Sequence, residues 1–170
     1  MLATLYPTDL GYRLLLLGHL LCVIVGFGAT FVLPLFGREA GKRGGPGGLA
    51  LSETATRVMD AVVTYPIYGA GAFGLALALA GDRMDEAWVG IAIALYVVSV
   101  SFAGFVHTPN LRRMDALAHE LAAGGGAPGP GGPPPQVVEL ASRSKAAARN
   151  GGILHLSFVV LLVLMIWQPS

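Results

Sequence analysis

The stretch YRLLLLGHLLCVIVGFGATFVLPLF, residues 12–36, decides the fold of this 170-residue chain. A helix needs about 20 consecutive apolar residues to cross the hydrocarbon core of a bilayer. This stretch reaches that length with Arg13, close to its beginning, as its only charged residue. It therefore predicts a membrane-spanning helix.

Three further apolar stretches follow, at about residues 59–80, 88–107 and 151–167. Hydrophobic residues make up 54% of the chain, and charged residues make up 12%, about half the share that is usual in soluble domains. The mean hydropathy is +0.66. A single cysteine, Cys22, excludes an internal disulfide and a cysteine metal cage. The sequence predicts an all-α integral membrane protein, an antiparallel four-helix bundle forming one domain over residues 1–170.

The first two connections between the spans differ in composition. Residues 81–87 (GDRMDEA) predict a tight polar turn. Residues 37–51 are rich in glycine and basic residues, which is typical of a loop. Ser52 then offers an N-cap for the helix that follows.

The third connection is the longest. Residues 110–123 (NLRRMDALAHELAA) predict a cytoplasmic amphipathic helix, whose apolar side carries Leu111, Met114, Leu117 and Leu121. Residues 124–136 (GGGAPGPGGPPPQ) predict a flexible Gly/Pro linker, and residues 137–149 predict a helix that leads into the last span.

Lysine and arginine residues are distributed unequally between the two sides of the predicted bundle. Nine of them fall on the side of the two long connections, and two fall on the other side. Because basic loops remain in the cytoplasm, we expect the long loops to be cytoplasmic and both termini to lie outside, in a bacterial inner membrane. Trp88 and Trp167 then share the outer interface, as an aromatic belt predicts. The nine basic residues are Arg38, Lys42, Arg43, Arg57, Arg112, Arg113, Arg143, Lys145 and Arg149; the two are Arg13 and Arg83.

Small and polar residues recur at helical spacing in the first three spans, where they predict the faces that meet inside the bundle. The stripes are Tyr12, His19, Cys22, Gly26 and Thr30; Asp60, Thr64, Gly71, Gly74 and Ala78; and Ala92, Tyr96, Ser99, Ala103 and His107. We expect Asp60, Thr30, Tyr96 and Ser99 to be buried polar residues. The segment GAGAFG at residues 69–74 matches GxGxxG, but no strand precedes it, so helix packing is favoured over dinucleotide binding.

Three histidines in or beside the spans are candidates for binding a cofactor: His19, His155 and His107. An imidazole within a membrane costs free energy unless it is hydrogen-bonded or ligates a metal. A structural hydrogen bond and a ligand role, to b-type haem or to a metal ion, are therefore both open for His19. Asp60 could serve a proton path, or it could pair with a nearby arginine such as Arg57.

The sequence also resembles a family of small bacterial four-span proteins that is known only as a domain of unknown function. The shared features are a histidine in the first span (LLLLGHLLCVIVGFGATF), a tryptophan opening the third (EAWVGIAIAL), a proline after it (HTPNLRRM) and the ending LMIWQPS. That family usually has lysine before the final proline, where this chain has Gln168.

The arrangement is similar, more distantly, to copper-resistance-D-type membrane proteins and HemJ-type protoporphyrinogen oxidases. In HemJ-type proteins a histidine of the first span and a lysine of a later span hold haem b. His19 matches that histidine, but no span of this chain contains lysine. The resemblance therefore implies a possible haem ligand at His19 and leaves the reaction, if the protein is an enzyme, unknown.

Three functions remain open from the sequence. The first is a structural, assembly or accessory subunit of a larger membrane complex, whose partners are the lipid bilayer and other membrane subunits. The second is a b-type haem- or metal-binding redox protein that uses His19 with His107 or His155. The third is a small proton-linked transporter. No nucleic-acid partner is expected.

Overall fold

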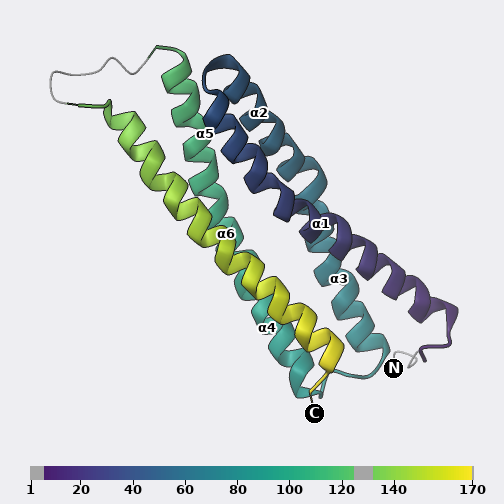
Figure 1. The fold of residues 1–170 in the computed structure, drawn as a ribbon. Helices are drawn as coiled ribbons and strands as arrows, with labels where there is room; N and C mark the ends of the chain where they lie inside the picture. The colour runs from purple at the N-terminus through teal and green to yellow at the C-terminus, as the bar shows by residue number, and fades with distance from the viewer. Residues whose placement is uncertain (1–5, 125–131, 170) are drawn as a thin grey trace.

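The computed structural model describes residues 6–124 and 132–169, and all the regular elements in these residues are helices (Figure 1). They join into four long rods, each apolar and long enough to cross a membrane. The first rod is α1 (Leu10–Arg43), and the last is α6 (Pro135–Trp167). The second rod consists of α2 (Gly45–Val58), η1 (Met59–Val63) and α3 (Thr64–Ala80). The third consists of α4 (Ala87–Phe102), η2 (Ala103–His107) and α5 (Thr108–Ala122).

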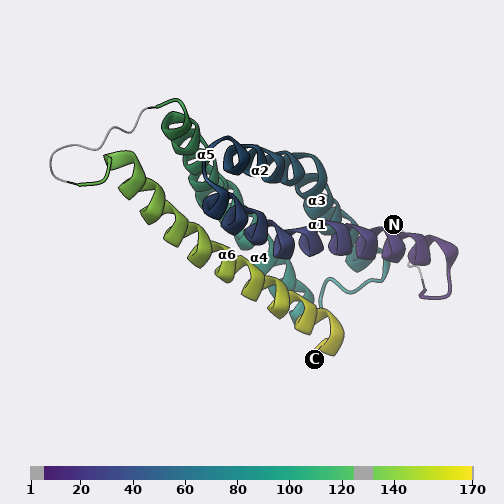
Figure 2. The ribbon, with the colours of Figure 1, turned by 45° about the horizontal axis from the view of Figure 1, so that its top comes forward.

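The four rods pack chiefly as two neighbouring pairs. Helix α1 lies along α2 and α3, while α6 lies along α4 and α5 (Figures 1 and 2). The pairs meet where α2 contacts α5, α3 contacts α4 and α1 contacts α6. The start of α1 and the end of α6 lie at the same end of the molecule (Figure 1).

The reversal between α1 and α2 depends on two glycines. Gly44 and Gly45 have φ angles of 59° and 51°, which side chains rarely allow. A Cβ on Gly48 would then collide with the carbonyl oxygen of Ala40. The prediction of a loop over residues 37–51 is wrong, because close packing of α2 on α1 offsets the low helix propensity of glycine. The predicted N-cap is also wrong: Ser52 lies inside α2 and donates to Asp115.

Each of the two interrupted rods contains one π-helical segment shortly before a proline. Segment η1 precedes Pro66, and η2 precedes Pro109. A prolyl ring collides with the carbonyl group four residues earlier, and these carbonyls belong to Val62 and Phe105, within the π segments. The wider π-helical turn leaves space for the prolyl ring. Each π segment also contains one extra residue, which rotates the helix before the segment by about 100° relative to the helix after it.

The interior of the molecule is built largely from small residues, since Ala70, Ala78 and Ala92 are buried together with four larger apolar side chains. Many leucine, valine and phenylalanine side chains are exposed on the helix surfaces. The predicted amphipathic helix is confirmed as α5, and its Leu117 is 0% exposed. Most of the predicted Gly/Pro linker, residues 125–131, lies outside the described residues, and its last residues, Pro135 and Gln136, begin α6.

Candidate functional site

His19 is the most deeply buried of the candidate residues. It lies in α1 with 7% of its surface exposed, and its Nδ1 lies 2.9 Å from the carbonyl oxygen of Ala70 in α3. A carbonyl can only accept, so Nδ1 carries the proton and Nε2 keeps its lone pair. Gly74 provides the space, because a Cβ there would lie 3.1 Å from Cε1 of His19. The imidazole is thus fixed between α1 and α3.

The glycine-rich segment of α3, residues 69–74, receives side chains from two neighbouring helices. The Sγ of Cys22 would lie 2.8 Å from a Cβ on Gly69, and the ring of Tyr96 would lie 2.5 Å from one on Gly71. The Tyr96 hydroxyl donates to the carbonyl oxygen of Ile67 at 2.8 Å. The segment is therefore a packing surface within a helix, as its sequence context indicates.

His155 lies at a different level of the molecule. Its Nε2 is 3.2 Å from the hydroxyl of Thr30, and its ring stacks on Phe31 with centroids 4.2 Å apart. Thr30 donates its own proton to the carbonyl of Phe27 at 2.7 Å, so its oxygen accepts from Nε2–H. This hydrogen bond and the ring stacking join α6 to α1.

His107 and Ser99 are the two described residues with a fully buried side-chain polar atom that has no hydrogen-bond partner, namely Nδ1 and Oγ. His107 lies in η2, and its ring faces α6, where a Cβ on Gly151 would lie 3.9 Å from Cε1. Buried polar atoms normally have hydrogen-bond partners, so these two atoms are exceptions among the described residues.

The structure does not bring His19 together with either of the other candidate histidines. His155 lies against Thr30, which is eleven residues beyond His19 in the same helix and so about 16 Å further along its axis. The contacts Phe27–Phe158 and Thr30–His155 show that residue numbers fall along α6 as they rise along α1. His107, beside Gly151, is therefore farther still from His19.

Asp60 is exposed, so the prediction that it is a buried polar residue is wrong. The reason is the π-helical turn, in which the Thr64 hydroxyl donates to the carbonyl of Met59, five residues earlier. The extra residue rotates Asp60 outward and turns Val63, which is 0% exposed, inward. Asp60 forms no ion pair with Arg57 or with any other described residue.

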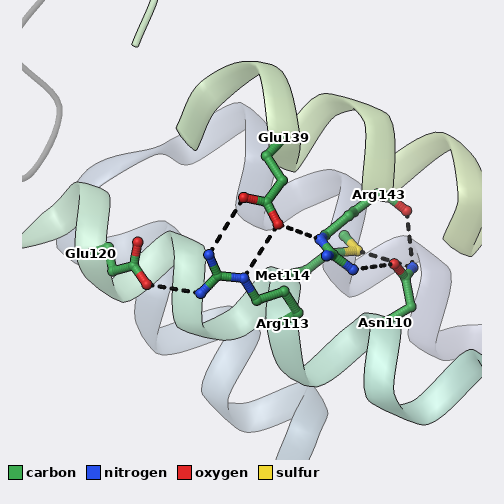
Figure 3. A network of polar contacts seen from close by, with 6 residues as sticks. All are labelled: Asn110, Arg113, Met114, Glu120, Glu139 and Arg143. Atoms are coloured by element: carbon green, nitrogen blue, oxygen red, sulfur yellow. Dashed lines mark hydrogen bonds and ion pairs between the residues drawn. The ribbon is translucent and has the colours of Figure 1, made fainter. Parts of the chain in front are cut away.

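A charged network joins α5 to α6 beyond the apolar part of the bundle (Figure 3). The Glu139 carboxylate accepts from Arg143 at 2.7 Å and from Arg113 at 3.3 and 3.4 Å. These guanidinium groups, Arg143 first, lower the pKa of Glu139. Asn110 accepts from Arg143 and donates to its carbonyl. These arginines entered the orientation prediction, but the network itself was not predicted. The four-residue spacing of Glu139 and Arg143, which suits an ion pair on a helix, is the signal for it in the sequence.

At the opposite end of the molecule, Arg83 makes a two-point ion pair with Glu86, at 2.7 and 3.0 Å. It also donates to Gln168 at 2.7 Å and lies 4.9 Å from the ring centre of Trp88. The Arg83 hydrogen bonds lower the pKa of Glu86. Gln168, the residue that departs from the resemblance, thus ties the end of α6 to the turn between α3 and α4.

His119 joins α2 to α5 in a further polar contact outside the predicted spans. Its Nδ1 donates to the Asp115 carbonyl at 2.9 Å, and its Nε2 donates to Glu53 at 3.1 Å. Both partners are acceptors, which favours the doubly protonated ring, and the pKa of His119 is raised by the Asp115 carbonyl first and by Glu53 second.

This arrangement predicts a pH-dependent stability. A histidine whose pKa is raised by folding stabilises the folded state fully below its unfolded pKa of about 6.5, and this stabilisation is lost as pH rises through the folded pKa. We expect the Tm of the solubilised protein to fall between pH 5.5 and pH 8.5, and to fall less in His119→Gln. A His119→Gln protein with the same pH dependence as wild type would contradict this assignment.

Comparison with protein-family models, with curated proteins and with solved structures gives no match for this chain. Within residues 6–124 and 132–169, no three His, Cys, Asp or Glu side chains are grouped so that they could hold a metal ion. His19, Tyr96 and His155 instead form separate hydrogen bonds, each between two helices.

Proposed function

We propose that the chain is an integral protein of the bacterial inner membrane that crosses the bilayer four times as an antiparallel four-helix bundle. Four apolar rods of sufficient length support this proposal. So do the many large apolar side chains on their outer surfaces, which would be costly in water and suit contact with lipid. The polar side chains His19, Tyr96 and Thr30 take partners within the chain, as residues of a membrane interior must.

The proposed orientation places both termini outside and α2, α5 and the first half of α6 on the cytoplasmic side, because nine of eleven basic residues lie toward that end. We expect an alkaline phosphatase fusion after Ser170 to be active. We expect the same reporter inserted at Gly129 to be inactive, and a green fluorescent reporter at Gly129 to fluoresce. An active phosphatase at Gly129 would show that the orientation is reversed.

Within the membrane, we propose a structural or accessory role, as a subunit that supports a larger complex. The observation that carries this proposal is that the interior polar groups hold helices to one another: His19 joins α1 to α3, Tyr96 joins α4 to α3, and His155 joins α6 to α1. Helices joined by these hydrogen bonds form a rigid bundle. Its apolar outer faces are then available for contact with neighbouring subunits.

Purification from native membranes in a mild detergent tests this role. We expect the tagged chain to elute in an assembly larger than its own micelle, with a second membrane protein in fixed stoichiometry that cross-links to α1 or α4. Elution of the chain alone under every gentle extraction condition would contradict an accessory role.

The second candidate is the binding of b-type haem or a metal ion through His19. It is favoured by one observation: Nδ1 is held by the Ala70 carbonyl, the arrangement that commonly orients a histidine ligand and leaves Nε2 free to coordinate. Its second ligand is not His107 or His155 of the same chain, because both lie at another level.

An absorption spectrum of the purified chain with its His19→Ala variant separates the two functions. A haem protein gives a Soret band that His19→Ala abolishes while the bundle remains helical. If His19 is structural, the wild type has no Soret band, and His19→Ala lowers the free energy of unfolding by only about 1 kcal/mol, the scale of a hydrogen bond between membrane helices.

A further inference from the structure

A groove of about 530 Å³ lies between η2 and α5 on one side and α6 on the other. Its apolar end is formed by Phe105 and Val106, in the last turn of the third predicted span, and Phe105 is 84% exposed. Its polar end is formed by Arg113, Arg143 and Arg149. Apolar and then basic surfaces therefore follow one another along the helix axis, in the same order as the acyl chains and headgroup of a phospholipid.

The arginines of the groove are held in place and still have donors to offer. Glu139 fixes both Arg113 and Arg143, as Figure 3 shows. Arg143 uses Nε and Nη1 in these contacts, while its Nη2 makes no hydrogen bond within the described residues. Arg149 forms no ion pair with any residue that the structure describes. A guanidinium fork with free N–H groups matches the oxygens of a phosphate.

Asn150 adds an uncharged polar group to the groove. It is 3% exposed, it lines the groove, and its side chain makes no hydrogen bond to the residues of the described ranges. Its amide is not among the fully buried polar atoms that lack a partner, so it is accessible from the groove and can hydrogen-bond to a polar group there. A phosphate ester or glycerol oxygen in the groove can accept from Asn150, because Asn150 and Arg149 both line it.

The charges select among headgroups. The groove has three arginines, and the two carboxylates that pair with them, Glu139 and Glu120, leave one positive charge in excess. One phosphodiester carries one negative charge and balances it. A headgroup that adds an ammonium group, as in phosphatidylethanolamine or phosphatidylcholine, would restore the excess positive charge. The balance therefore favours a monoanionic headgroup.

We propose that the groove between α5 and α6 binds the phosphodiester of a phosphatidylglycerol-type lipid, with Arg149, Arg143 and Asn150 as its headgroup contacts and Phe105 and Val106 beside its acyl chains. The proposal rests on the proposed membrane insertion. Basic pockets between membrane helices on the cytoplasmic side are a usual setting for anionic headgroups.

The test is native mass spectrometry of the full chain in detergent, titrated with phosphatidylglycerol, phosphatidylethanolamine or phosphatidylcholine of identical acyl chains. We expect wild type to bind the first about tenfold more tightly than the other two. Arg149→Gln should reduce this preference about fivefold, the usual effect of one basic residue near an anionic membrane, while Arg149→Lys should retain most of it. Arg57→Gln, which removes an exposed arginine of α2 outside the groove, should leave it unchanged.

Three outcomes would overturn the site: equal binding of the three lipids to wild type, equal losses in Arg149→Gln and Arg57→Gln, or full displacement of the lipid by equimolar glycerol phosphate, which has no acyl chains. A chain that stays in water without detergent and binds none of the lipids would contradict the four-span proposal itself. A membrane-extracted, helical wild type without headgroup preference would overturn the groove alone.

Discussion

Gly26→Val should lower the free energy of unfolding by about 3 kcal/mol, the upper part of the range for overpacking a tight interior. A Cβ on Gly26 would lie 3.0 Å from the backbone nitrogen of Ile67 and 3.2 Å from the backbone carbon of Pro66. These neighbours are backbone atoms, so no side-chain rotation relieves the contact, and α1 must move away from α3. An unfolding titration with sodium dodecyl sulfate in mixed micelles, followed by circular dichroism, measures the loss.

Gly28 supplies the matched control for this experiment. It lies two residues away in the same helix, and nothing comes within 4 Å of the position of its Cβ. Gly28→Val therefore makes the same change in volume and helix propensity without the collision, and we expect an effect within about 0.5 kcal/mol. Equal losses in the two variants would mean that the α1–α3 contact is not the tight packing surface inferred from Gly26.

Part of the fold, including the inward face of α1 that carries Gly26, was predicted correctly from the sequence. The positions of the four apolar rods follow from the length of apolar runs, and the stripe of His19, Cys22 and Gly26 correctly indicates the face that α1 turns toward α3. The prediction of a loop over residues 37–51 was wrong because it rested on the low helix propensity of glycine, which is a local property. In the structure the glycines allow a tight reversal and close packing of α2, which are tertiary effects.

The candidate site was predictable only in part, for a reason that Asp60 makes clear. Sequence spacing assumes 3.6 residues per turn, whereas the turn before Pro66 is π-helical, so the side chains before it rotate out of the expected stripe. Pro66 was a visible signal for a kink, but it does not determine whether the helix bends or widens. His19, in a helix without a π segment, keeps the predicted inward direction, and Tyr96, seven residues before η2, still donates to the Ile67 carbonyl of α3.

The burial of Asn150 depends on the register between helices, which the sequence does not determine. Its sequence neighbours, Arg149 and Gly151, suggest an exposed polar boundary, yet it is 3% exposed because it lies where α6 faces η2 and α5. Which turn of one helix meets which turn of another depends on the register between helices. Two spans joined by a long connection, as the third and fourth are, leave this register open in the sequence.

Leu117→Ala should lower the free energy of unfolding by about 2–5 kcal/mol, the range found when a fully buried leucine is truncated and leaves a cavity. Leu117 is 0% exposed and lies in α5, beyond the predicted span, where burial from water gives its full hydrophobic stabilisation. Leu117 lies seven residues after Asn110 and four after Arg113, so it shares the face of α5 that contacts α6 through these two residues. Val138→Ala in α6, at a side chain that is 56% exposed, is the control and should change stability by less than about 0.5 kcal/mol. Hydrogen exchange of the amides in α5 and in the first half of α6 locates the effect: faster exchange there with unchanged protection in α3 and α4 is the expected result, and a Leu117→Ala protein as stable as Val138→Ala would contradict the packing of α5.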